Sequence, residues 1–507
     1  MRRNRYVLSA VCMAFLSALP GIADTAGWRG DGTGHFADAK PPADWSKAAD
    51  GKMRHILWQV KLPHYSWATP LIVGDRLFVR SEPYDLLCFD KNTGKLMWVR
   101  SHGPHEAVSE EDRTGPLWPE VLAAAGKLDE VNKTVYALAD PPKALVVEKY
   151  QAQKQLNDLT AKINRRYRLA PELWRGKWSG YTGSTPCTDG RNIYFISCMG
   201  VVGCYDLDGN RQWMVNEPMT PAAMGEHGTG SSPVLAGDRL VYCLNGTVVA
   251  LDKKTGGPIW RQEFDRGDAS PSVVAFECGG ETWLIARGRF IRAKDGSAAP
   301  FNDEHLRVMS MLATPVIAGN VAYFQDSAGR LLWCKWESKA PGELNVTRVH
   351  LLQFGLPDES KRWDNGANFW VPSPVISGGM AYCLSNQGRM VVVDLANAKI
   401  TFDAKLDLAP NIYTTSMHGG YIVGACASPA LAGGKLYVMD NTGTTLVMQP
   451  GPEPKVLAKN RIEQVVQPWD EKHWDSPHQE ATLASPVFDG GRIYYRAELY
   501  LYCVGEK

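Results

Sequence analysis

The sequence lacks an excess of charge of either sign. Its 507 residues carry 55 Lys and Arg against 54 Asp and Glu, which leaves a formal net charge of +1. No long block of like charge occurs, so nothing in the charge pattern favours binding to nucleic acid or to an anionic membrane surface. Beyond the first residues, no apolar run is long enough to cross a bilayer as a helix.

The common catalytic signatures are also missing. The sequence contains no Gly-x-Ser-x-Gly, no His-Glu-x-x-His and no phosphate-binding loop. It has no Cys-x-x-Cys, so neither an attached haem nor a zinc site of the usual spacing is indicated. The stretch Asp206-Leu207-Asp208-Gly209-Asn210 is faintly like a calcium loop, but its Gly stands at the wrong position, and we interpret it as a turn.

What the chain does contain is a short phrase that recurs eight times. The phrase is Ser or Thr, then Pro, an apolar strand, a Gly turn and a second apolar strand. In seven copies a Gly falls four residues after the Pro, and in six an aromatic residue follows four residues later. A repeat of roughly 40–60 residues built from short strands is typical of a propeller. The copies begin at Thr69-Pro70, Thr185-Pro186, Ser232-Pro233, Ser270-Pro271, Thr314-Pro315, Ser373-Pro374, Ser428-Pro429 and Ser485-Pro486.

The third copy shows how one repeat folds. Apolar runs at 234–236, 240–244 and 248–251 predict three strands, and a fourth begins at Ile259. Gly237-Asp238 and Asn245-Gly246 are strong turn signals between them. Four antiparallel strands joined by tight turns make one propeller blade. The fourth copy is the most degenerate, with its turn moved to Gly279-Gly280.

The two ends of the repeat array complement each other. The last copy, 485–504, has room for three strands, whereas 56–62 is a strand without a blade of its own. We therefore predict an all-β, eight-bladed β-propeller of four-stranded antiparallel blades, closed by this N-terminal strand in the last blade. Closure would leave only short outer edges unpaired.

The spacing between the first two copies is more than twice the usual one. The additional chain predicts a helical insertion at 101–178, with helices at 119–127 and 142–168. Within the second, a partial apolar stripe at helical spacing allows two interpretations, a lid packed on the disc or a partner-binding arm. The stripe consists of Leu145, Lys149, Leu156, Leu159 and Ile163.

The N-terminus is typical of a signal peptide. Basic residues precede an apolar run at 7–19, and Pro20-Gly21 ends it before a plausible cleavage site at Ala23. We expect an exported protein, periplasmic or secreted. The predicted organisation is 1–23 signal peptide, 24–100 N-terminal segment, closing strand and blade one, 101–178 helical insertion, and 179–507 blades two to eight.

Ten cysteines follow the signal peptide. Several lie within apolar strand phrases, where Cys acts as a small buried hydrophobe. We expect most of them to be free core residues. In an oxidising compartment Cys198 and Cys204, which flank one turn, are the best candidate pair.

The segments before each Ser/Thr-Pro phrase, here called the entrance segments, carry the candidate site. In a propeller these segments meet on one face around the axis, and they are rich in polar and aromatic side chains, which a ligand site needs. The candidate ligand-binding residues are His64, Trp67, Trp178, Tyr181, Glu226, His227, Asp268, Arg307, Trp363, Asp364, Asn368, Trp370, His418, Trp474, Asp475 and His478.

The ending Asp90-Lys-Asn-Thr-Gly-Lys-Leu-Met-Trp98 of the first copy, repeated at 252–260, resembles the repeat of pyrroloquinoline-quinone (PQQ)-type propellers. With the opening Trp28-Arg29-Gly30, the chain looks most like secreted quinone-repeat-like proteins of this superfamily, over about 28–100 and 180–507. The superfamily also includes quinoprotein dehydrogenases and an outer-membrane assembly factor that is a lipoprotein. Cys12 lies inside the apolar run in a poor lipoprotein signal, which departs from that last pattern.

Three functions follow from the resemblance. The first is a binding or scaffold protein with a protein or glycan partner at the entrance segments or the helical insertion, without nucleic acid, metal or an assigned cofactor, and not an enzyme. The second is a PQQ- and calcium-dependent oxidoreductase of alcohols or sugars, with Asp364, Asp475 or Glu480 as base or metal ligand. The alcohol-oxidising members carry an adjacent Cys pair that is absent here. The third is an envelope assembly factor that binds strands by β-augmentation.

Overall fold

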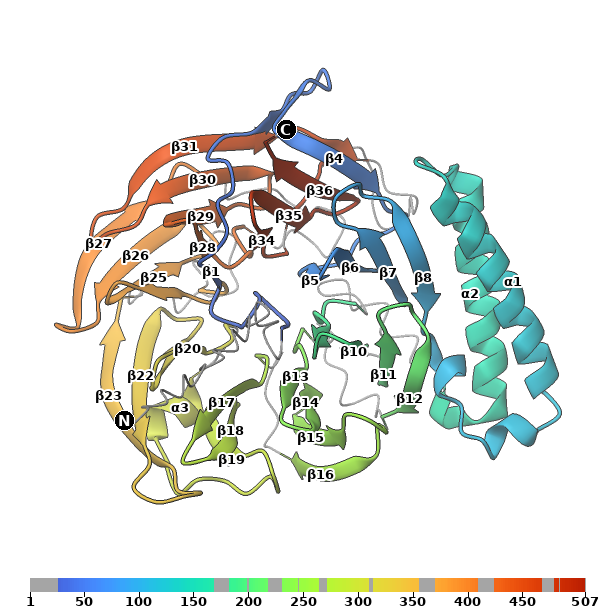
Figure 1. Ribbon diagram of the computed structural model, residues 1–507, viewed down its shortest axis with the longest axis horizontal. Helices are drawn as coiled ribbons and strands as arrows, with labels where there is room; N and C mark the ends of the chain where they lie inside the picture. Colours follow the sequence, from blue (N-terminus) through green and yellow to red (C-terminus); the bar gives the residue numbers. More distant parts are fainter. Residues whose placement is uncertain are drawn as a thin grey trace, which may run out of the picture.

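Eight successive sheets are arranged around a central axis in the computed structural model (Figure 1). The structure describes residues 26–167, 182–197, 200–217, 230–244, 246–263, 271–309, 313–354, 370–408, 424–466, 478–482 and 484–506. The expected all-β repeat architecture is confirmed, and eight blades built mainly of four strands fit the observed sheets. Within each repeat the consecutive strands pair antiparallel, and the first strand of the repeat lies nearest the axis.

The strand bounds are as follows. Blade one has β5 (Leu71–Val73), β6 (Arg76–Ser81), β7 (Asp85–Asp90) and β8 (Leu96–Ser101); blade two has β9 (Cys187–Thr188), β10 (Asn192–Ile196), β11 (Val201–Asp206) and β12 (Arg211–Asn216). Blade three has β13 (Val234–Ala236), β14 (Arg239–Leu244), β15 (Thr247–Asp252) and β16 (Pro258–Glu263); blade four has β17 (Val274–Cys278), β18 (Glu281–Ala286) and β19 (Arg289–Arg292). Blade five has β20 (Val316–Ala318), β21 (Val321–Gln325), β22 (Arg330–Glu337) and β23 (Asn345–Gln353); blade six has β24 (Val375–Ser377), β25 (Met380–Leu384), β26 (Arg389–Asp394) and β27 (Lys399–Lys405). Blade seven has β28 (Ala430–Ala432), β29 (Lys435–Met439), β30 (Thr444–Gln449) and β31 (Lys455–Ile462); blade eight has β34 (Val487–Asp489), β35 (Arg492–Arg496) and β36 (Tyr500–Gly505).

The last sheet has a fourth strand from the N-terminal part of the chain. β4 (Ile56–Lys61) pairs antiparallel with β36, in a register that places Gln59 opposite Tyr502. Figure 1 shows this blue strand lying beside the red C-terminal one. The last sheet therefore takes its outer strand from the opposite end of the chain.

Two blades depart from the predicted pattern. Blade four has three strands among the described residues, so the expectation of four strands in every blade is wrong there. Blade seven grows to seven strands, because β1 (His35–Phe36) joins its inner edge and the hairpin β2 (Ser46–Lys47) and β3 (Met53–Arg54) extends its outer edge. A separate two-stranded sheet, β32 (Val465–Val466) with β33 (His478–Gln479), lies between blades seven and eight in the chain.

Among the described residues, one hydroxyl in each of six blades accepts a backbone N–H from the neighbouring blade. The backbone N–H of Thr69 donates to Thr185 Oγ1 at 3.0 Å, and the N–H of Thr185 donates to Ser232 Oγ at 3.0 Å. The same link, at 2.9–3.1 Å, runs from Ser232 to Ser272, Ser272 to Thr314, Ser373 to Ser428, and Ser428 to Ser485. These buried bonds explain why Ser or Thr stands at this point of the phrase. They form the hydroxyl ring.

The hydroxyl ring shows that the position predicted for the fourth copy of the phrase was wrong. Its equivalent position is Ser272, two residues before β17, and Val273 occupies the place of the proline. The predicted phrase at Ser270-Pro271 was therefore two residues out of register. The displaced turn at Gly279-Gly280 follows from this, because β17 is longer than the other first strands.

A second repeated contact fixes the outer parts of neighbouring blades. Trp213 Nε1 on β12 donates to the carbonyl of Lys253 at 2.9 Å, and its ring lies against Gly256, which has φ of 73°. A Cβ on Gly256 would lie 2.5 Å from the Trp213 ring. The contact explains the Thr-Gly and Trp of the repeat ending. Equivalent pairs are Trp58 with Gly94, Trp98 with Gly209, and Trp260 with Gly296.

The remaining repeat features behave as expected. The stretch at Asp206 is the turn between β11 and β12, with Asp206 Oδ1 accepting the N–H of Asp208 at 2.9 Å and of Asn210 at 2.8 Å. The nine cysteines within the described residues are all free, and seven of them are buried. Cys204 is among these free thiols, and Cys198, the other member of the candidate pair, lies outside the described residues.

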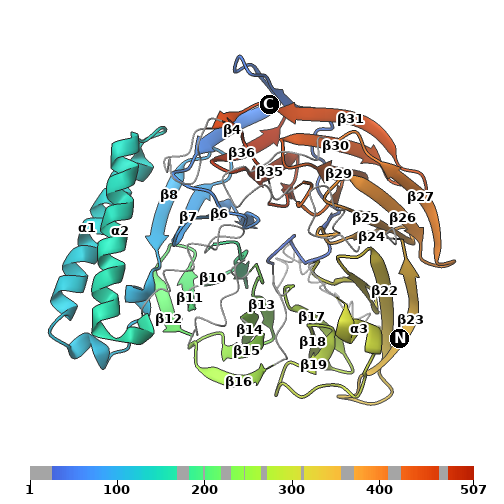
Figure 2. The same ribbon diagram turned by 180° about the vertical axis from the view of Figure 1, so that it is seen from behind.

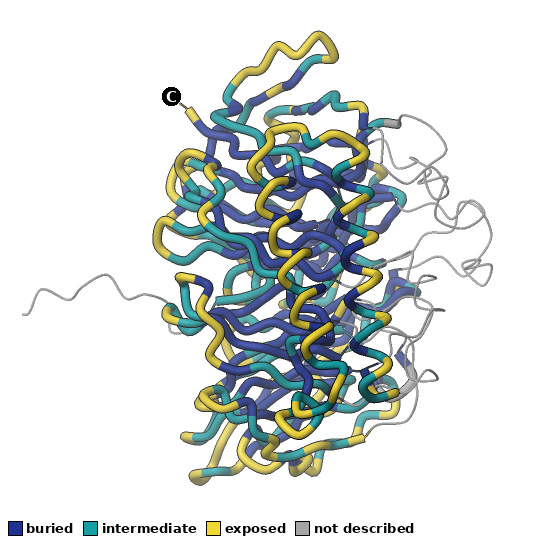
Figure 3. The backbone as a smooth tube through the Cα atoms, turned by 90° about the vertical axis from the view of Figure 1, so that its right-hand side faces the viewer, coloured by how far each residue is buried: buried dark blue, intermediate teal, exposed yellow. Residues whose placement is uncertain are grey.

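The insertion between blades one and two forms a helical hairpin. α1 (Trp118–Ala137) and α2 (Lys143–Ile163) pack antiparallel at the outer edge of the disc beside β8, in both views of Figures 1 and 2. α1 is longer than predicted. Short 3₁₀ turns, Pro104–Ala107, Asp112–Thr114 and Arg165–Tyr167, lead into and out of the pair. Figure 3 shows its outward side exposed and the strands behind it largely buried.

A buried polar network attaches the helical pair to blade one. Lys149 Nζ on α2 lies 2.7 Å from Asp85 Oδ2 at the start of β7, and both side chains are fully buried. Tyr136 from α1 and Ser101 from β8 also donate to this carboxylate. Burial, followed by the Asp85 charge, holds the pKa of Tyr136 well above its usual value. The stripe position Lys149 is therefore a buried polar anchor between α2 and blade one.

We expect Lys149→Ala to lower the free energy of unfolding of the helical pair by about 3–5 kcal/mol, because it leaves the Asp85 carboxylate buried and unpaired. Urea unfolding followed by circular dichroism at 222 nm measures this. The control is Lys154→Ala, which breaks an exposed pair with Asp158 at 2.6 Å on the same helix and should cost at most about 0.5 kcal/mol. Equal effects of the two variants would contradict the anchoring role.

We expect Gly256→Ala to destabilise the protein by about 1–3 kcal/mol more than Gly237→Ala, because only the first added methyl meets a ring. Both glycines have positive φ, 73° and 63°, so both variants carry the same backbone strain. A Cβ at Gly237 would meet nothing within 4 Å. Thermal unfolding of the two variants measures the difference, and identical midpoints would show that the Trp213 contact is dispensable.

Candidate functional site

The structure describes only part of the predicted ligand-binding face. His64, Trp67 and Trp370 are described in full, whereas Arg307 and His478 are placed by backbone alone, in α3 (Glu304–Val308) and in β33. The other predicted residues lie outside the described residues. They are Trp178, Tyr181, Glu226, His227, Asp268, Trp363, Asp364, Asn368, His418, Trp474 and Asp475.

The described aromatic residues serve packing between blades and helices. Trp370 is fully buried, and its ring lies 4.6 Å from that of Phe354 in the core between blades five and six. His64 and Trp67 are half-buried and flank Tyr65, whose ring lies 4.6 Å and 5.2 Å from theirs. His64 also meets Tyr150 of α2 edge-on at 5.4 Å, so the helical pair touches the first entrance segment.

The sequence analysis missed a second set of residues on this face, the turns between the second and third strands of blades five, six and seven. Their backbone groups bind the entrance segments. The carbonyl of Ser327 accepts from Trp370 N–H at 3.4 Å, and the carbonyl of Asn386 accepts from Ala425 N–H at 2.8 Å. The carbonyl of Asn441 likewise accepts from Thr482 N–H at 3.1 Å. The polar residues that recur after the second strand of a blade were the sequence signal that could have identified these turns.

Buried arginines extend these contacts across blades eight, one and two. Arg80, at the end of β6, donates to the carbonyls of Ser184 at 3.1 Å and Ile196 at 2.6 Å. Arg496, at the equivalent place in β35, donates to the carbonyls of Glu498 at 2.9 Å and His64. Both side chains are 1% exposed or less, and burial lowers the pKa of Arg496 to about 10. These cations therefore hold backbone carbonyls and stay away from bulk solvent.

The buried carboxylates of this region also form hydrogen bonds to the backbone. Glu82 accepts from the N–H of Thr182 at 2.7 Å and from its hydroxyl. Glu480 accepts the N–H groups of Leu499 at 2.8 Å and Tyr500 at 2.6 Å, and the Tyr502 hydroxyl at 2.7 Å. Burial raises the pKa of Glu480 to about 7 despite these bonds. Glu480, a conceivable base in the oxidoreductase interpretation, here fixes the start of β36.

The axis itself is crossed by the N-terminal segment. Residues 26–36 run from Thr188 of blade two, where Ala26 forms a bridge, to blade seven, where β1 pairs parallel with β28. Arg29 is 1% exposed and donates to the carbonyls of Pro374 at 3.3 Å and Pro429 at 2.6 Å. Burial lowers its pKa to about 9. The opening Trp28-Arg29-Gly30 is thus an axial strap that links opposite sides of the disc.

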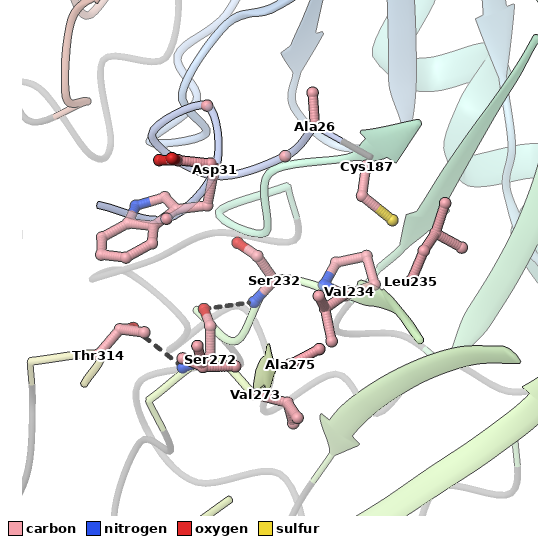
Figure 4. Close-up of a pocket in the computed structure, with 16 residues that line it drawn as sticks. Ala26, Asp31, Cys187, Ser232, Val234, Leu235, Ser272, Val273, Ala275 and Thr314 are labelled. Carbon is pink, nitrogen blue, oxygen red and sulfur yellow. Dashed lines mark hydrogen bonds between the residues drawn. The ribbon is translucent and has the colours of Figure 1, made fainter. Parts of the chain in front are cut away.

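A small cavity remains between the axial strap and blades two to five (Figure 4). Its volume is about 130 Å³. Ser232, Ser272 and Thr314 of the hydroxyl ring line it, together with apolar side chains of the first strands, and Asp31 of the strap faces it. Asp31 is engaged by the N–H of Thr33 at 2.9 Å and its hydroxyl at 2.6 Å. The cavity suits a few waters or a very small solute.

The described residues do not fit PQQ with calcium. Ligand sites for molecules of this size usually occupy about 300–1,000 Å³, more than the axial cavity provides. Within the part of the chain that the structure describes, no group of three His, Cys, Asp or Glu side chains could hold a metal ion. The carboxylates of Glu82 and Glu480 are occupied by backbone and hydroxyl donors.

The fold and the repeat ending define a PQQ-like repeat propeller. A family model described as outer membrane protein assembly factor BamB matches residues 46–139, 169–282 and 198–449, and the chain belongs to this family. No curated protein matches the sequence.

Solved structures with the same fold include proteins of two kinds. BamB from Moraxella catarrhalis is 10% identical, with a TM-score of 0.51 over 89% of this chain and 99% of that one. Quinohemoprotein alcohol dehydrogenase ADHIIG from Pseudomonas putida HK5 is 10% identical, with a TM-score of 0.52 over 89% and 76%. Quinohemoprotein alcohol dehydrogenase from Comamonas testosteroni is 9% identical, with a TM-score of 0.51 over 89% of this chain and 77% of that one. At these identities the likeness concerns the fold alone.

The described helices include α1 and α2, the two longest. None of them is both long and apolar enough to cross a bilayer.

Glu480 makes stability depend on pH. Its folded pKa of about 7 exceeds the ordinary 4.5, so the folded state holds a proton that the unfolded state releases. The stabilisation is complete below about pH 4.5 and is lost as pH rises through about 7, by about 3 kcal/mol in total. We expect Glu480→Gln to remove this part of the pH dependence.

Urea unfolding of the wild type and the Glu480→Gln variant, compared at intervals from pH 4.5 to 8, isolates the contribution from other titrating groups. The control is Glu453→Gln, a change at an exposed position. Parallel stability curves for wild type and Glu480→Gln would contradict the raised pKa.

Proposed function

We propose that this protein is an exported PQQ-like propeller, closed by β4 in its last blade, that acts as a binding or scaffold protein. The observation that carries the proposal is that the charged side chains at the entrance face are buried and form structural hydrogen bonds. Arg80, Glu82, Glu480 and Arg496 are buried and engaged in joining blades to entrance segments. A face built in this way supports a rigid surface, because these charged groups hold the entrance segments in place.

The proposed organisation follows the sequence. Residues 1–23 act as a signal peptide removed near Ala23, and the mature chain is periplasmic or secreted. Residues 101–178 are the helical insertion, and the blades occupy 24–100 and 179–507. A role in the cell envelope agrees with the family description, which names an outer-membrane assembly factor.

A protein partner is the favoured class. The family description concerns assembly of outer-membrane proteins, and propeller blades present outer strand edges that an extended segment can join by β-augmentation. We propose that the entrance segments contribute side-chain contacts, with Trp178, Tyr181, Glu226, His227, Asp268, Trp363, Asp364, Asn368, His418, Trp474 and Asp475 as candidates. A glycan partner at the same face or at the helical insertion is the other outcome.

We expect the mature protein, residues 24–507, to bind an unfolded outer-membrane β-barrel polypeptide, diluted from urea, with micromolar affinity in biolayer interferometry. An unfolded soluble helical protein of similar size is the control ligand and should bind at least about tenfold more weakly. The double variant Trp178→Ala/Tyr181→Ala should weaken binding, whereas Lys254→Ala, in a turn at the opposite end of its blade, should not.

A calorimetric titration with PQQ, with and without calcium, separates this proposal from the oxidoreductase. No heat of binding is expected. Micromolar or tighter PQQ binding, or turnover of an alcohol or sugar by the reconstituted protein, would overturn the proposal. Failure of every polypeptide to bind, with no PQQ binding, would instead direct the search to glycans.

A further inference from the structure

A polar cleft lies between the helical pair and the outer strands of blades one and two. We call it the helix cleft. Its volume is about 480 Å³, within the range of about 300–1,000 Å³ that small-molecule sites occupy. Its lining comes from α1, from β8, from the 3₁₀ turn that contains Glu106, from Tyr205 of β11 and from the turn into β12. It shares no lining residue with the axial cavity or with the entrance segments.

Asn132 of α1 supplies a hydrogen-bond acceptor without a partner in this cleft. The side chain is 3% exposed, and its Nδ2 donates to Ser101 Oγ at 2.7 Å. Ser101 in turn donates its hydroxyl hydrogen to Asp85, so its oxygen is the acceptor for Asn132 and the orientation of the amide is fixed. The Oδ1 atom has no hydrogen-bond partner. A buried acceptor left unpaired costs about 1–3 kcal/mol, which favours a donor held in the cleft.

Asp129 places a carboxylate beside that acceptor. It precedes Asn132 by three residues on α1, so the two share one helical face. Both line the cleft. Among the described residues, no hydrogen bond or ion pair engages the Asp129 carboxylate. Glu106, the other acid of the lining, is already paired with Arg211 at 2.6 Å. The free acceptors therefore gather along α1.

The cleft also contains fixed and free positive charge. Arg100 of β8 donates from Nε to the carbonyl of Gly209 at 2.7 Å, and its guanidinium lies 5.5 Å from the Trp98 ring centre. Lys133 follows Asn132 on α1, lines the cleft and is exposed. No ion pair engages its ammonium within the described chain. Acceptors for a cation and donors for an anion thus lie in one cavity.

We propose that the helix cleft binds a small zwitterion, an amino acid or short peptide with a free ammonium and a free carboxylate. The ammonium binds Asp129 and Asn132 Oδ1, and the carboxylate binds Lys133 and Arg100. The site is independent of the proposed scaffold function, because it uses neither the entrance segments nor the axial cavity.

The test is calorimetric titration of the mature protein with L-alanyl-L-alanine and with L-alanine. Two matched probes each lack one charge, N-acetyl-L-alanyl-L-alanine the ammonium and L-alanyl-L-alanine amide the carboxylate. We expect a zwitterion to bind and each blocked probe to bind at least about tenfold more weakly, as the loss of a charge-assisted hydrogen bond predicts. The dipeptide and the free amino acid, compared directly, show which size the cleft takes.

Two exposed substitutions keep the fold and test the residues. Asp129→Asn and Lys133→Gln should each weaken zwitterion binding about tenfold. Glu130→Gln, the same charge change on the neighbouring residue outside the cleft, should leave binding unchanged. No binding of either zwitterion, equal binding of a blocked probe, or equal effects of Asp129→Asn and Glu130→Gln would overturn the proposal and leave a cleft filled by water alone.

Discussion

A bond between a hydroxyl and a backbone N–H, repeated from blade to blade, is the contact on which the architecture depends. Six such bonds of the hydroxyl ring lie within the described chain, all buried around the axis. Each contributes only about 1 kcal/mol, but each also fixes the height of one inner strand against the next. The axial cavity, the strap carrying Arg29 and the turns at the entrance face take their positions from that register.

The fold could be predicted because its determinants are local. Pro, Gly and Trp at fixed spacing specify strand starts, turns and blade contacts, and each has a physical reason visible within one repeat. Blade four was misread because Ser272 keeps the hydroxyl while Val273 replaces the proline and the turn is displaced. The prediction ended the first helix of the insertion at residue 127, whereas packing against α2 and β8 carries α1 to Ala137.

The site was harder to predict because its partners are distant in sequence. Nothing near Arg496 indicates that its guanidinium reaches the carbonyl of His64, and nothing near Asp85 indicates that Lys149 from the insertion will pair with it. Composition identified polar and aromatic entrance segments. It could not distinguish Trp370, which is buried core, from side chains that face solvent. That distinction depends on which strand lies opposite, and this is decided only after assembly.

The pairing of β4 with β36 has a consequence for the order of folding. Most blades are hairpins whose strands follow each other closely, so they can form early and independently. The last sheet has to join segments from opposite ends of the described chain. Because this step closes the longest loop, it has the largest cost in chain entropy. Until it occurs, β36 presents an open edge. A passing strand could occupy that edge in place of β4, so domain-swapped dimers are the expected failure of refolding at high concentration.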